Sequence, residues 1–289
     1  MSPGLTMGEN RHNVFTMKKR NSLRLKKVIH FWIGLSFLWP SSGGITCTLF
    51  GAKGNSVEGG GVLIGKTRDR LESLKQVFIE VSPKGGYRYQ GISTKGKTIV
   101  TSGINEKGLV VVSASASNLE KEDKITTVGK ILGKALSVDG VIEMVKRGEV
   151  QGPVHYLAGD AHKIALFEVI DGKRNGILVK EDGILCHTNH FILKEMKNFN
   201  PKSGTSSMTR FNRIEFLLGH APFTKDRFIA FTKDHFKKAG NNSICRHFEA
   251  GTRSSERTVS AAVFYLPQNG PPETWVALGQ PCQSTFEKH

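Results

Sequence analysis

The chain has 289 residues, a formal net charge of +16 at pH 7 and 38% hydrophobic residues. This length suits one large domain or two small ones, and the hydrophobic share is enough for a buried core. A basic surface can attract anionic partners, but the sequence contains none of the aromatic-interleaved basic motifs of single-strand or RNA binders, so we expect no nucleic-acid partner.

Residues 1–46 have the pattern of a secretory leader. They hold seven Lys or Arg and one Glu, which leaves about +6 of the net charge in this segment. A basic run from Met17 to Lys27 precedes the mostly apolar residues 28–39, which are too few to span a hydrocarbon core of roughly 30 Å. The small, turn-prone residues 40–44 then suit a cleavage site. We therefore expect a signal peptide from Met17, its removal on maturation, and export to the periplasm or the cell exterior.

Two other interpretations of this leader stay open. It can be an uncleaved membrane anchor, or a lipoprotein signal that ends at Cys47 and makes the chain a cell-envelope lipoprotein. A lipoprotein signal has Gly, Ala or Ser immediately before its cysteine, whereas Thr46 stands there. Lipidation is therefore disfavoured, and we expect membrane contact only through the leader.

After Cys47 the pattern alternates between blocks of strands and blocks of helices. Short apolar runs predict strands, and apolar residues at helical spacing predict two pairs of helices between them. Strands are expected at 61–65, 76–81, 98–100, 108–114, 154–157, 163–170, 176–179, 183–186, 258–266 and 274–278, with a turn at 103–108. Helices are expected within 126–150, where Asp139-Gly140 separates two of them, from residue 206, and within 228–236. Such runs predict an α+β fold with antiparallel sheets in one domain over residues 47–289.

Cys47 is the candidate nucleophile. A free thiol has a pKa of about 8.5 and is mostly protonated at neutral pH, whereas the reactive form is the thiolate. If Cys47 becomes the first residue of the mature chain, its own α-amine, with a pKa of about 7.7–8.0, can act as the base. We therefore expect the thiol of Cys47 to attack and its amine to take up the proton.

Groups that could support this chemistry follow along the chain. Asp69 lies in a charged turn between two expected strands and could orient the amine, and the flanking Lys66 and Arg68 could favour the thiolate. Asn189 follows an apolar strand and could donate its amide to the oxyanion of a tetrahedral intermediate. Spacing alone also allows Asp69 and Asn189 to be ordinary turn residues. Arg246 is a candidate for binding a substrate carboxylate.

Cysteines and histidines gather twice in the second half of the chain and raise the alternative of a zinc site. The residues concerned are Cys186, His187, His190, Cys245 and His247. On a strand, His187 and His190 would point to opposite faces, so we expect no metal ligand set, and the chemistry above needs no other cofactor. Three cysteines remain besides Cys47, and they can form at most one disulfide, whose pairing cannot be read from the sequence: Cys186, Cys245 and Cys282.

Six short motifs fall in order along the chain and resemble the acyl-coenzyme A:6-aminopenicillanic acid acyltransferase family, peptidase family C45. More distantly they resemble the choloylglycine hydrolases. The motifs are Cys47-Thr48, Gly65-Lys66-Thr67-Arg68-Asp69, Gly103-Ile104-Asn105-Glu106-Lys107-Gly108-Leu109, Leu185-Cys186-His187-Thr188-Asn189-His190-Phe191, Ser206-Ser207-Met208-Thr209-Arg210-Phe211 and Ser243-Ile244-Cys245-Arg246-His247. The ending from Ala277 to Cys282 also fits, so the resemblance covers roughly Cys47 to Phe286.

The resemblance implies an N-terminal-nucleophile hydrolase with an αββα fold, in which two antiparallel sheets lie between helical layers. It implies a small-molecule substrate with a linear, non-peptide amide bond, which is hydrolysed or transferred through a cysteinyl thioester. By motif match, Cys47 is the nucleophile, Asp69 the partner of its amine and Asn189 an oxyanion donor. Arg210 matches an active-site arginine of the choloylglycine branch, and Lys66 stands where that branch carries an arginine.

The chain departs from the family pattern at three positions. Thr67 stands where asparagine is usual, and Arg70 stands where an aromatic residue often follows the aspartate. The second asparagine of the choloylglycine branch corresponds approximately to Ser115, with Asn118 just beyond. We expect these changes to affect substrate binding and to leave the nucleophile unchanged.

Substrate contacts are expected from Arg68, Ser115 and Arg246. The changed positions also leave an inactive binding protein of the same fold as an alternative. A homo-oligomer stays open. So does the question whether a signal peptidase or the chain itself cuts before Cys47.

Overall fold

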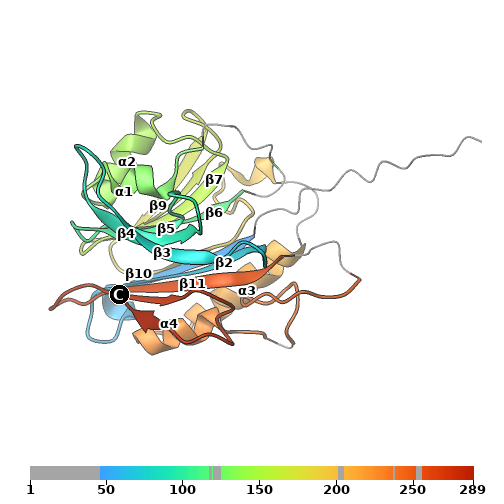
Figure 1. The fold of residues 1–289 in the computed structure, drawn as a ribbon. Coiled ribbons are helices and arrows are strands. Elements are labelled where there is room, and N and C mark those ends of the chain that lie inside the picture. The colour runs from blue at the N-terminus through green and yellow to red at the C-terminus, as the bar shows by residue number, and fades with distance from the viewer. Residues whose placement is uncertain (1–45, 117–118, 120–124, 201–204, 237, 252–255) are drawn as a thin grey trace, which may run out of the picture. The chain divides into compact units, whose positions relative to one another are not determined.

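The computed structural model describes residues 46–116, 119, 125–200, 205–236, 238–251 and 256–289. In this part of the chain two sheets lie face to face, and a pair of helices covers the outer face of each (Figure 1). The leader expected up to residue 45, and Asn118, lie outside the described residues. No helix in the described part is both long and apolar enough to cross a membrane.

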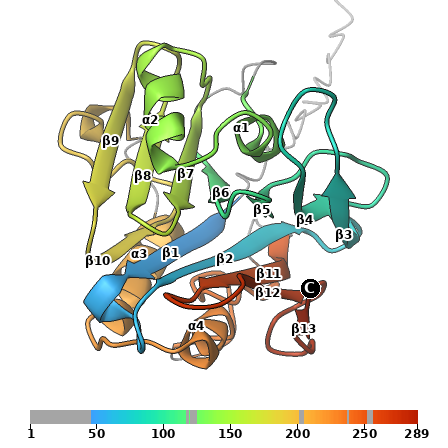
Figure 2. The same ribbon diagram turned by 90° about the vertical axis from the view of Figure 1, so that its left-hand side faces the viewer.

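The first sheet has six strands in the order β10-β1-β2-β11-β12-β13, and every neighbouring pair is antiparallel. The strands are β1 (Cys47–Lys53), β2 (Val62–Leu71), β10 (Gly183–His187), β11 (Glu256–Leu266), β12 (Glu273–Ala277) and β13 (Glu287–Lys288). Segments far apart in sequence therefore meet in this sheet, because β1 and β2 lie between β10 and β11 (Figure 2).

The second sheet has seven strands in the order β3-β4-β5-β6-β7-β8-β9, again antiparallel throughout. The strands are β3 (Gln76–Val81), β4 (Tyr89–Thr94), β5 (Ser102–Asn105), β6 (Val110–Ser115), β7 (Val154–Gly159), β8 (Ile164–Val169) and β9 (Asn175–Lys180). Each strand pairs with its neighbours in sequence, so this sheet is a meander.

The helices of the described part lie between these strands in the chain. They are α1 (Val128–Leu132), α2 (Val138–Lys146), α3 (Thr205–Leu218) and α4 (Lys225–Thr232), with short 3₁₀ helices η1 (Gly54–Ser56) and η2 (Lys197–Phe199). The pair α1 and α2 is inserted between β6 and β7, and the pair α3 and α4 precedes β11.

Three apolar clusters hold the layers together. One lies between the two sheets and includes Leu49 of β1 and Leu157 of β7. The second lies under α1 and α2, and the third under α3 and α4, where the rings of Phe50 and Phe228 have centres 5.1 Å apart. Leu49 and Phe50 face opposite layers because side chains alternate along a strand. The layered arrangement confirms the expected α+β fold of αββα type.

The predicted break between the first two helices at Asp139-Gly140 is wrong. The chain leaves the helical path earlier, at residues 133–137, and α2 begins at Val138. The side chain of Ser137 caps this helix by accepting a hydrogen bond from Gly140 N at 3.3 Å. The cap satisfies an otherwise unpaired amide of the first turn, so the helix runs through the position where glycine predicted a break.

The strand predicted at 98–100 is also shifted. The regular strand, β5, begins at Ser102 and takes in residues from the turn predicted at 103–108. Gly103 is opposite Gly91 of β4, and a Cβ on Gly103 would overlap the carbonyl oxygen of Gln90. The glycine is therefore used for close approach of two strands, whereas its sequence context predicted a turn.

Gly65 lies where β2 passes the ring of Phe50. The two residues are directly opposite in the pairing of β1 with β2, and a Cβ on Gly65 would overlap the ring of Phe50. Phe50 is fully buried, with the rings of Phe228 and Phe231 centred 5.1 and 6.1 Å from it. The glycine therefore admits the ring that ties the strand carrying Cys47 to the helical layer.

We expect Gly65→Ala to lower the free energy of unfolding by about 1–3 kcal/mol, because the added methyl group overpacks the core against Phe50. Urea titration measures this change. Gly140→Ala in α2 is the matched control, since its Cβ would lie 3.4 Å from Ala135 Cβ, an ordinary contact. The control should be neutral or stabilise the chain by up to about 1 kcal/mol. Equal stability of the two variants would contradict the role given to Gly65.

Candidate active site

Cys47 begins β1 and lies beside the glycine-led motif of β2. In the antiparallel pairing Cys47 is opposite Arg68, and Leu49 is opposite Lys66. Residues directly opposite one another share a face of the sheet. Cys47 and Leu49 belong to the cluster between the sheets, so the side chains of Lys66 and Arg68 leave β2 on the same side as the Cys47 thiol.

Two buried basic side chains therefore share the face of the thiol. Lys66 is 2% exposed, and its Nζ donates to the carbonyl oxygen of Thr101 at 2.8 Å. Burial lowers the pKa of Lys66 to about 7, an effect that Cys47 partly opposes. Burial also lowers the pKa of Arg68, to about 10, and its guanidinium donates to polar side chains of β3 and β4. At pH 7 Arg68 is therefore protonated and Lys66 is about half protonated, so a thiolate on Cys47 would lie beside positive charge.

The main chain of Cys47 is held on both sides. Its N–H donates to Asn189 Oδ1 at 3.1 Å, and its carbonyl oxygen accepts from Arg210 Nη1 at 2.6 Å. Arg210 Nη1 also donates to Thr48 Oγ1 at 3.0 Å, and Nη2 donates to Asn189 Oδ1 at 2.9 Å. One asparagine and one arginine therefore clamp the residue, which is 1% exposed.

These contacts fix which way the Asn189 amide points. The Cys47 N–H and the Arg210 guanidinium can only donate, so the atom that faces both must be the side-chain oxygen. Asn189 Nδ2 in turn donates to Ser115 O at 2.8 Å. With Thr46 still attached to Cys47, Asn189 presents an acceptor to the nucleophile. This geometry supports a role in orienting the Cys47 nitrogen and differs from the oxyanion-donor role implied by the family resemblance.

Helix α3 carries Arg210 and also holds Asn189 in place. Ser207 and Arg210 lie one turn apart on its buried face, and Ser207 Oγ accepts the Asn189 N–H at 2.9 Å. Arg210 is fully buried, and burial lowers its pKa to about 10, so it stays protonated at neutral pH. A buried charge is tolerated when acceptors surround it, and here Cys47, Thr48 and Asn189 provide them.

A buried network holds the loop that carries Asn189. His187 Nε2 lies 2.7 Å from Glu168 Oε1, and His155 Nε2 lies 3.2 Å from the carbonyl oxygen of Asn189. Glu168 Oε1 also accepts the Ile192 N–H at 2.6 Å. Burial lowers the pKa of His155 well below its ordinary value, so this ring is neutral. The network joins β7 and β8 to the end of β10 and so positions Asn189 for Cys47.

The turn predicted around Asp69 is wrong, because Asp69 lies within β2, which continues to Leu71. Its side chain leaves the strand on the face opposite to Lys66 and Arg68 and is fully buried. Its Oδ2 accepts from Thr46 Oγ1 at 2.9 Å, and its Oδ1 accepts from Thr258 Oγ1 at 2.7 Å. Arg246 Nη1 lies 3.7 Å from Asp69 Oδ2, donates to Thr46 Oγ1, and is 3.4 Å from Glu256 Oε2. The residue that precedes the nucleophile is therefore bound through its side chain by a carboxylate and an arginine.

The structure brings the expected site residues into one region around the start of β1. Ser115 takes part through its carbonyl oxygen, Cys47 through its main-chain N–H and carbonyl oxygen, and the others through their side chains. The residues are Cys47, Lys66, Arg68, Asp69, Ser115, Asn189, Arg210 and Arg246. Their catalytic and substrate-binding roles remain predictions.

Three residues of this region were not expected from the sequence: Thr46, Glu256 and Thr258. Glu256 and Thr258 belong to β11, and the Thr258 contact with Asp69 joins residues 189 positions apart. No local pattern marks such a contact. The signal that could have singled out Thr46 is its position directly before the candidate nucleophile.

The zinc grouping raised by the sequence does not form. His187 is engaged with Glu168, and Cys186 packs against the cluster under α3 and α4, where burial raises its pKa to about 12. Such a thiol is inert. Cys245 and His247 lie in a separate loop before β11. All four cysteines are free thiols in the structure.

Two antiparallel sheets between helical layers are the fold of the N-terminal-nucleophile amidohydrolases and acyltransferases. The chain belongs to the acyl-coenzyme A:6-aminopenicillanic acid acyl-transferase family, whose model matches residues 56–282. This match confirms the resemblance drawn from the motifs, and Cys47 lies just before the matched stretch. No curated protein sequence matches the chain.

Solved structures with this fold are similar over most of the chain. A Caenorhabditis elegans N-acylethanolamine-hydrolyzing acid amidase ortholog has a TM-score of 0.51 at 11% identity, covering 82% of this chain and 98% of that one. A mutant of conjugated bile acid hydrolase from Clostridium perfringens has a TM-score of 0.47 at 14% identity, covering 84% and 96%. Penicillin V acylase from Agrobacterium tumefaciens has a TM-score of 0.47 at 16% identity, covering 79% and 90%. The first of these supports the fold assignment.

Glu256, which pairs with Arg246, gives the chain a pH-dependent stability. Burial raises the pKa of its carboxyl from 4.5 to about 7. Between these values the folded state holds a proton that the unfolded chain has released, so the free energy of unfolding falls as pH rises through this window. Glu256→Gln removes this contribution. We therefore expect its Tm, relative to the parent chain, to rise steadily from pH 4.5 to pH 7.

Glu106→Gln serves as the control for this measurement. Arg88 lowers the pKa of the exposed Glu106 by a side-chain hydrogen bond, so above about pH 5.5 its carboxylate is ionised in both the folded and the unfolded state. The Tm difference of this variant should therefore be nearly constant from about pH 5.5 to pH 7, where that of Glu256→Gln still rises. An equally constant difference for Glu256→Gln would show that Glu256 does not hold its proton in the folded chain.

Proposed function

We propose that the chain is a cysteine N-terminal-nucleophile enzyme that cleaves linear, non-peptide amide bonds through a thioester on Cys47. The observation that carries this proposal is the double clamp on the Cys47 main chain by Asn189 and Arg210. Lys66 and Arg68 on the thiol face add to it, because a cationic surrounding favours the thiolate. A cysteine that only filled space in the core would need none of these groups.

Maturation is proposed to cut the bond between Thr46 and Cys47. The Cys47 thiolate attacks the Thr46 carbonyl carbon, the C–N bond breaks as the Cys47 nitrogen takes up a proton, and the acyl group passes to sulfur. Water then hydrolyses this thioester, which releases a segment ending in the Thr46 carboxylate and leaves Cys47 with a free thiol and amine. The Asp69 N–H donates to Thr46 O at 3.0 Å and would stabilise the oxyanion of this step.

In the mature chain the amine of Cys47 would act as the base for its own thiol. Asn189 Oδ1 accepts the Cys47 N–H at 3.1 Å and is placed to orient that amine. Asp69 gives up its contact with the Thr46 hydroxyl on cleavage, and its carboxylate then becomes a second acceptor for the amine. The Asp69 carboxylate would therefore bind Thr46 before cleavage and the new α-amine of Cys47 after it.

Substrate cleavage would follow the same order of bonds. The thiolate adds to the amide carbon, the C–N bond breaks, and the amine product leaves with the proton that the Cys47 amine had taken up. The acyl group stays on sulfur until water resolves it, which completes hydrolysis, or until a second amine does, which completes acyl transfer. These steps balance without a metal or an organic cofactor.

Arg68, Arg246 and the neighbourhood of Ser115 are proposed to contact the substrate. Arg246 donates to the side chain of Thr46, so cleavage vacates one of its contacts for a polar group of the substrate. Acyl amides are the first compounds to test, because the family description names transfer to 6-aminopenicillanic acid and a similar structure is described as hydrolysing N-acylethanolamines. Residues 1–46 are proposed to export the chain as a signal peptide from Met17 and to be its only membrane contact.

Replacement of the nucleophile tests the proposal. We expect Cys47→Ala to lower hydrolysis of fluorogenic acyl arylamides by roughly 10³-fold or more, because no thioester can form. N-terminal sequencing should find Cys47 first in the parent chain, and the bond after Thr46 intact in Cys47→Ala. Cys186→Ala is the matched control and should keep both cleavage and activity, since its inert thiol lies under the helices.

Three outcomes would count against parts of the proposal. A diacylglycerol adduct on Cys47 by intact mass would replace the enzyme with the lipoprotein alternative. A mature chain that starts upstream and stays active as Cys47→Ser would remove the nucleophile. Normal cutting of Cys47→Ala would assign maturation to a separate peptidase and leave the catalytic role to be judged on activity.

The cation on the thiol face gives a second test in the mature chain. We expect Lys66→Met to slow alkylation of Cys47 by iodoacetamide at pH 7 by about tenfold, the change that one pKa unit produces in the thiolate fraction. Lys97→Met, at an exposed lysine, is the control and should leave the rate unchanged. Peptide mass spectrometry of Cys47 follows the reaction. Equal rates for both variants would show that Lys66 does not stabilise the thiolate.

A further inference from the structure

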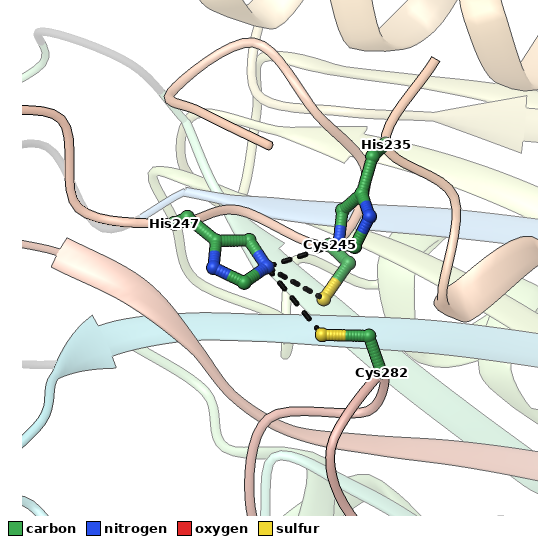
Figure 3. Close-up of side chains that lie close together, drawn as sticks. All are labelled: His235, Cys245, His247 and Cys282. Carbon is green, nitrogen blue, oxygen red and sulfur yellow. Dashed lines mark hydrogen bonds between the residues drawn. The ribbon is translucent and has the colours of Figure 1, made fainter. Parts of the chain in front are cut away.

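A cluster of two cysteines and two histidines lies outside the candidate active site. His235 follows α4, Cys245 and His247 lie in the loop before β11, and Cys282 lies in the turn after β12 (Figure 3). Nε2 of His247 is the centre of the cluster: it lies 2.9 Å from His235 Nε2, 3.4 Å from Cys282 Sγ and 3.9 Å from Cys245 Sγ. One ligand atom from each of the four residues lies within 4.8 Å of every other.

The three separations measured from His247 Nε2 are close to those of a tetrahedral metal site. With Zn–S bonds of about 2.3 Å and Zn–N bonds of about 2.0–2.1 Å, two nitrogens lie about 3.3 Å apart and a nitrogen and a sulfur about 3.6 Å apart. The observed distances fall on both sides of these values by a few tenths of an ångström. We propose that His235, Cys245, His247 and Cys282 bind one zinc ion as a Cys₂His₂ site. The proposal replaces the expectation from the sequence that the chain holds no metal.

Hydrogen bonds to backbone carbonyl oxygens hold the ligand-bearing loops together without the ion. Cys245 N donates to Asp234 O at 3.0 Å, next to His235, and His247 N donates to Gly240 O at 3.2 Å. The loop of Cys282 is joined to the same segment, because Gln280 Nε2 donates to Arg246 O at 2.8 Å. The loops that carry the four ligands are therefore already fixed in place, so binding of the ion costs less conformational entropy.

Charge and ligand number indicate a structural role for the ion. Two thiolates neutralise Zn²⁺, and two neutral imidazoles add no charge, so the loaded site suits its partly buried place in the fold. Four protein ligands fill a tetrahedral zinc and leave no position for water or substrate. We therefore assign the ion to holding together the two loops that carry the ligands, and give it no part in the chemistry at Cys47.

The site lies close to the active site through Arg246. This residue stands between the ligands Cys245 and His247, and its side chain points the other way, to Thr46, Asp69 and Glu256. Zinc would thus fix both neighbours of the arginine that contacts the residue before the nucleophile. Loss of the ion should therefore make the Arg246 side chain less well fixed against Thr46, Asp69 and Glu256.

A disulfide between Cys245 and Cys282 is the competing use of these thiols, and an exported chain meets an oxidising environment. A disulfide would use the two sulfurs alone. It would leave out the two imidazole Nε2 atoms, which lie 2.9 Å apart, at hydrogen-bond distance, beside the sulfurs. The convergence of all four ligand atoms therefore favours the ion.

Zinc content of the full chain tests the proposal. After loading with Zn²⁺ and dialysis, we expect about one zinc per chain by elemental mass spectrometry, and nearly none in Cys282→Ser or His235→Gln. Cys186→Ser is the matched cysteine control and should keep the zinc, because Cys186 lies on β10 away from the cluster. Chelation should lower the Tm of the parent chain and of the control, since a ligand that binds only the folded state stabilises it.

Cobalt binding to the parent chain keeps the test independent of how the variants fold. Co²⁺ should give the absorption bands of tetrahedral, thiolate-ligated cobalt, and Zn²⁺ should displace it. A parent chain that takes up no metal while its thiols are free overturns the proposal. A Cys245–Cys282 disulfide found by peptide mapping overturns it in favour of the competing use. Zinc retained by both ligand variants overturns the assignment of the ligands.

Discussion

The buried guanidinium of Arg210 is the contact on which the candidate active site depends. A charge without water must be surrounded by acceptors, and those of Arg210 are Cys47 O, Thr48 Oγ1 and Asn189 Oδ1. The three come from two segments of chain, so satisfying one cation brings α3, the start of β1 and the loop after β10 to one point. The hydrogen bonds that satisfy the Arg210 charge therefore also hold Cys47 in its place.

The pairing of β1 with β2 divides the supporting groups between two sides. Lys66 and Arg68 share the side of the Cys47 thiol, where a positive charge favours the thiolate. Asp69 lies on the other side, with the side chain of Thr46 and with Arg246. Alternation along a strand separates the two environments without any special geometry. The thiol and the nitrogen of one residue can therefore be surrounded by different charges.

Some residues of this arrangement could be predicted from the sequence. The motifs selected Cys47 and Asp69, but the sequence predicted no strand at Cys47 and placed Asp69 in a turn, whereas the two residues lie on adjacent antiparallel strands. The contact of Thr258 with Asp69 depends on the pairing of β2 with β11, which no local pattern reveals. The sequence also could not predict which way the Asn189 amide points. Its direction is set by two partners that can only donate hydrogen bonds, the Cys47 N–H and the Arg210 guanidinium. Local prediction also failed in helix α2. The glycine at 140 predicted a break, but the Ser137 cap stabilises a helix that runs through this position.

Arg246 shows how the two sites of the chain are linked. Its side chain is committed to the carboxylates of Asp69 and Glu256, while the residues on either side of it point into the cysteine–histidine cluster. A three-residue segment with ligands at its ends cannot shift without carrying the arginine between them. An ion that held Cys245 and His247 would therefore act on the environment of Asp69 through the backbone alone. The cluster lies in loops, and a metal is a compact way to make them rigid.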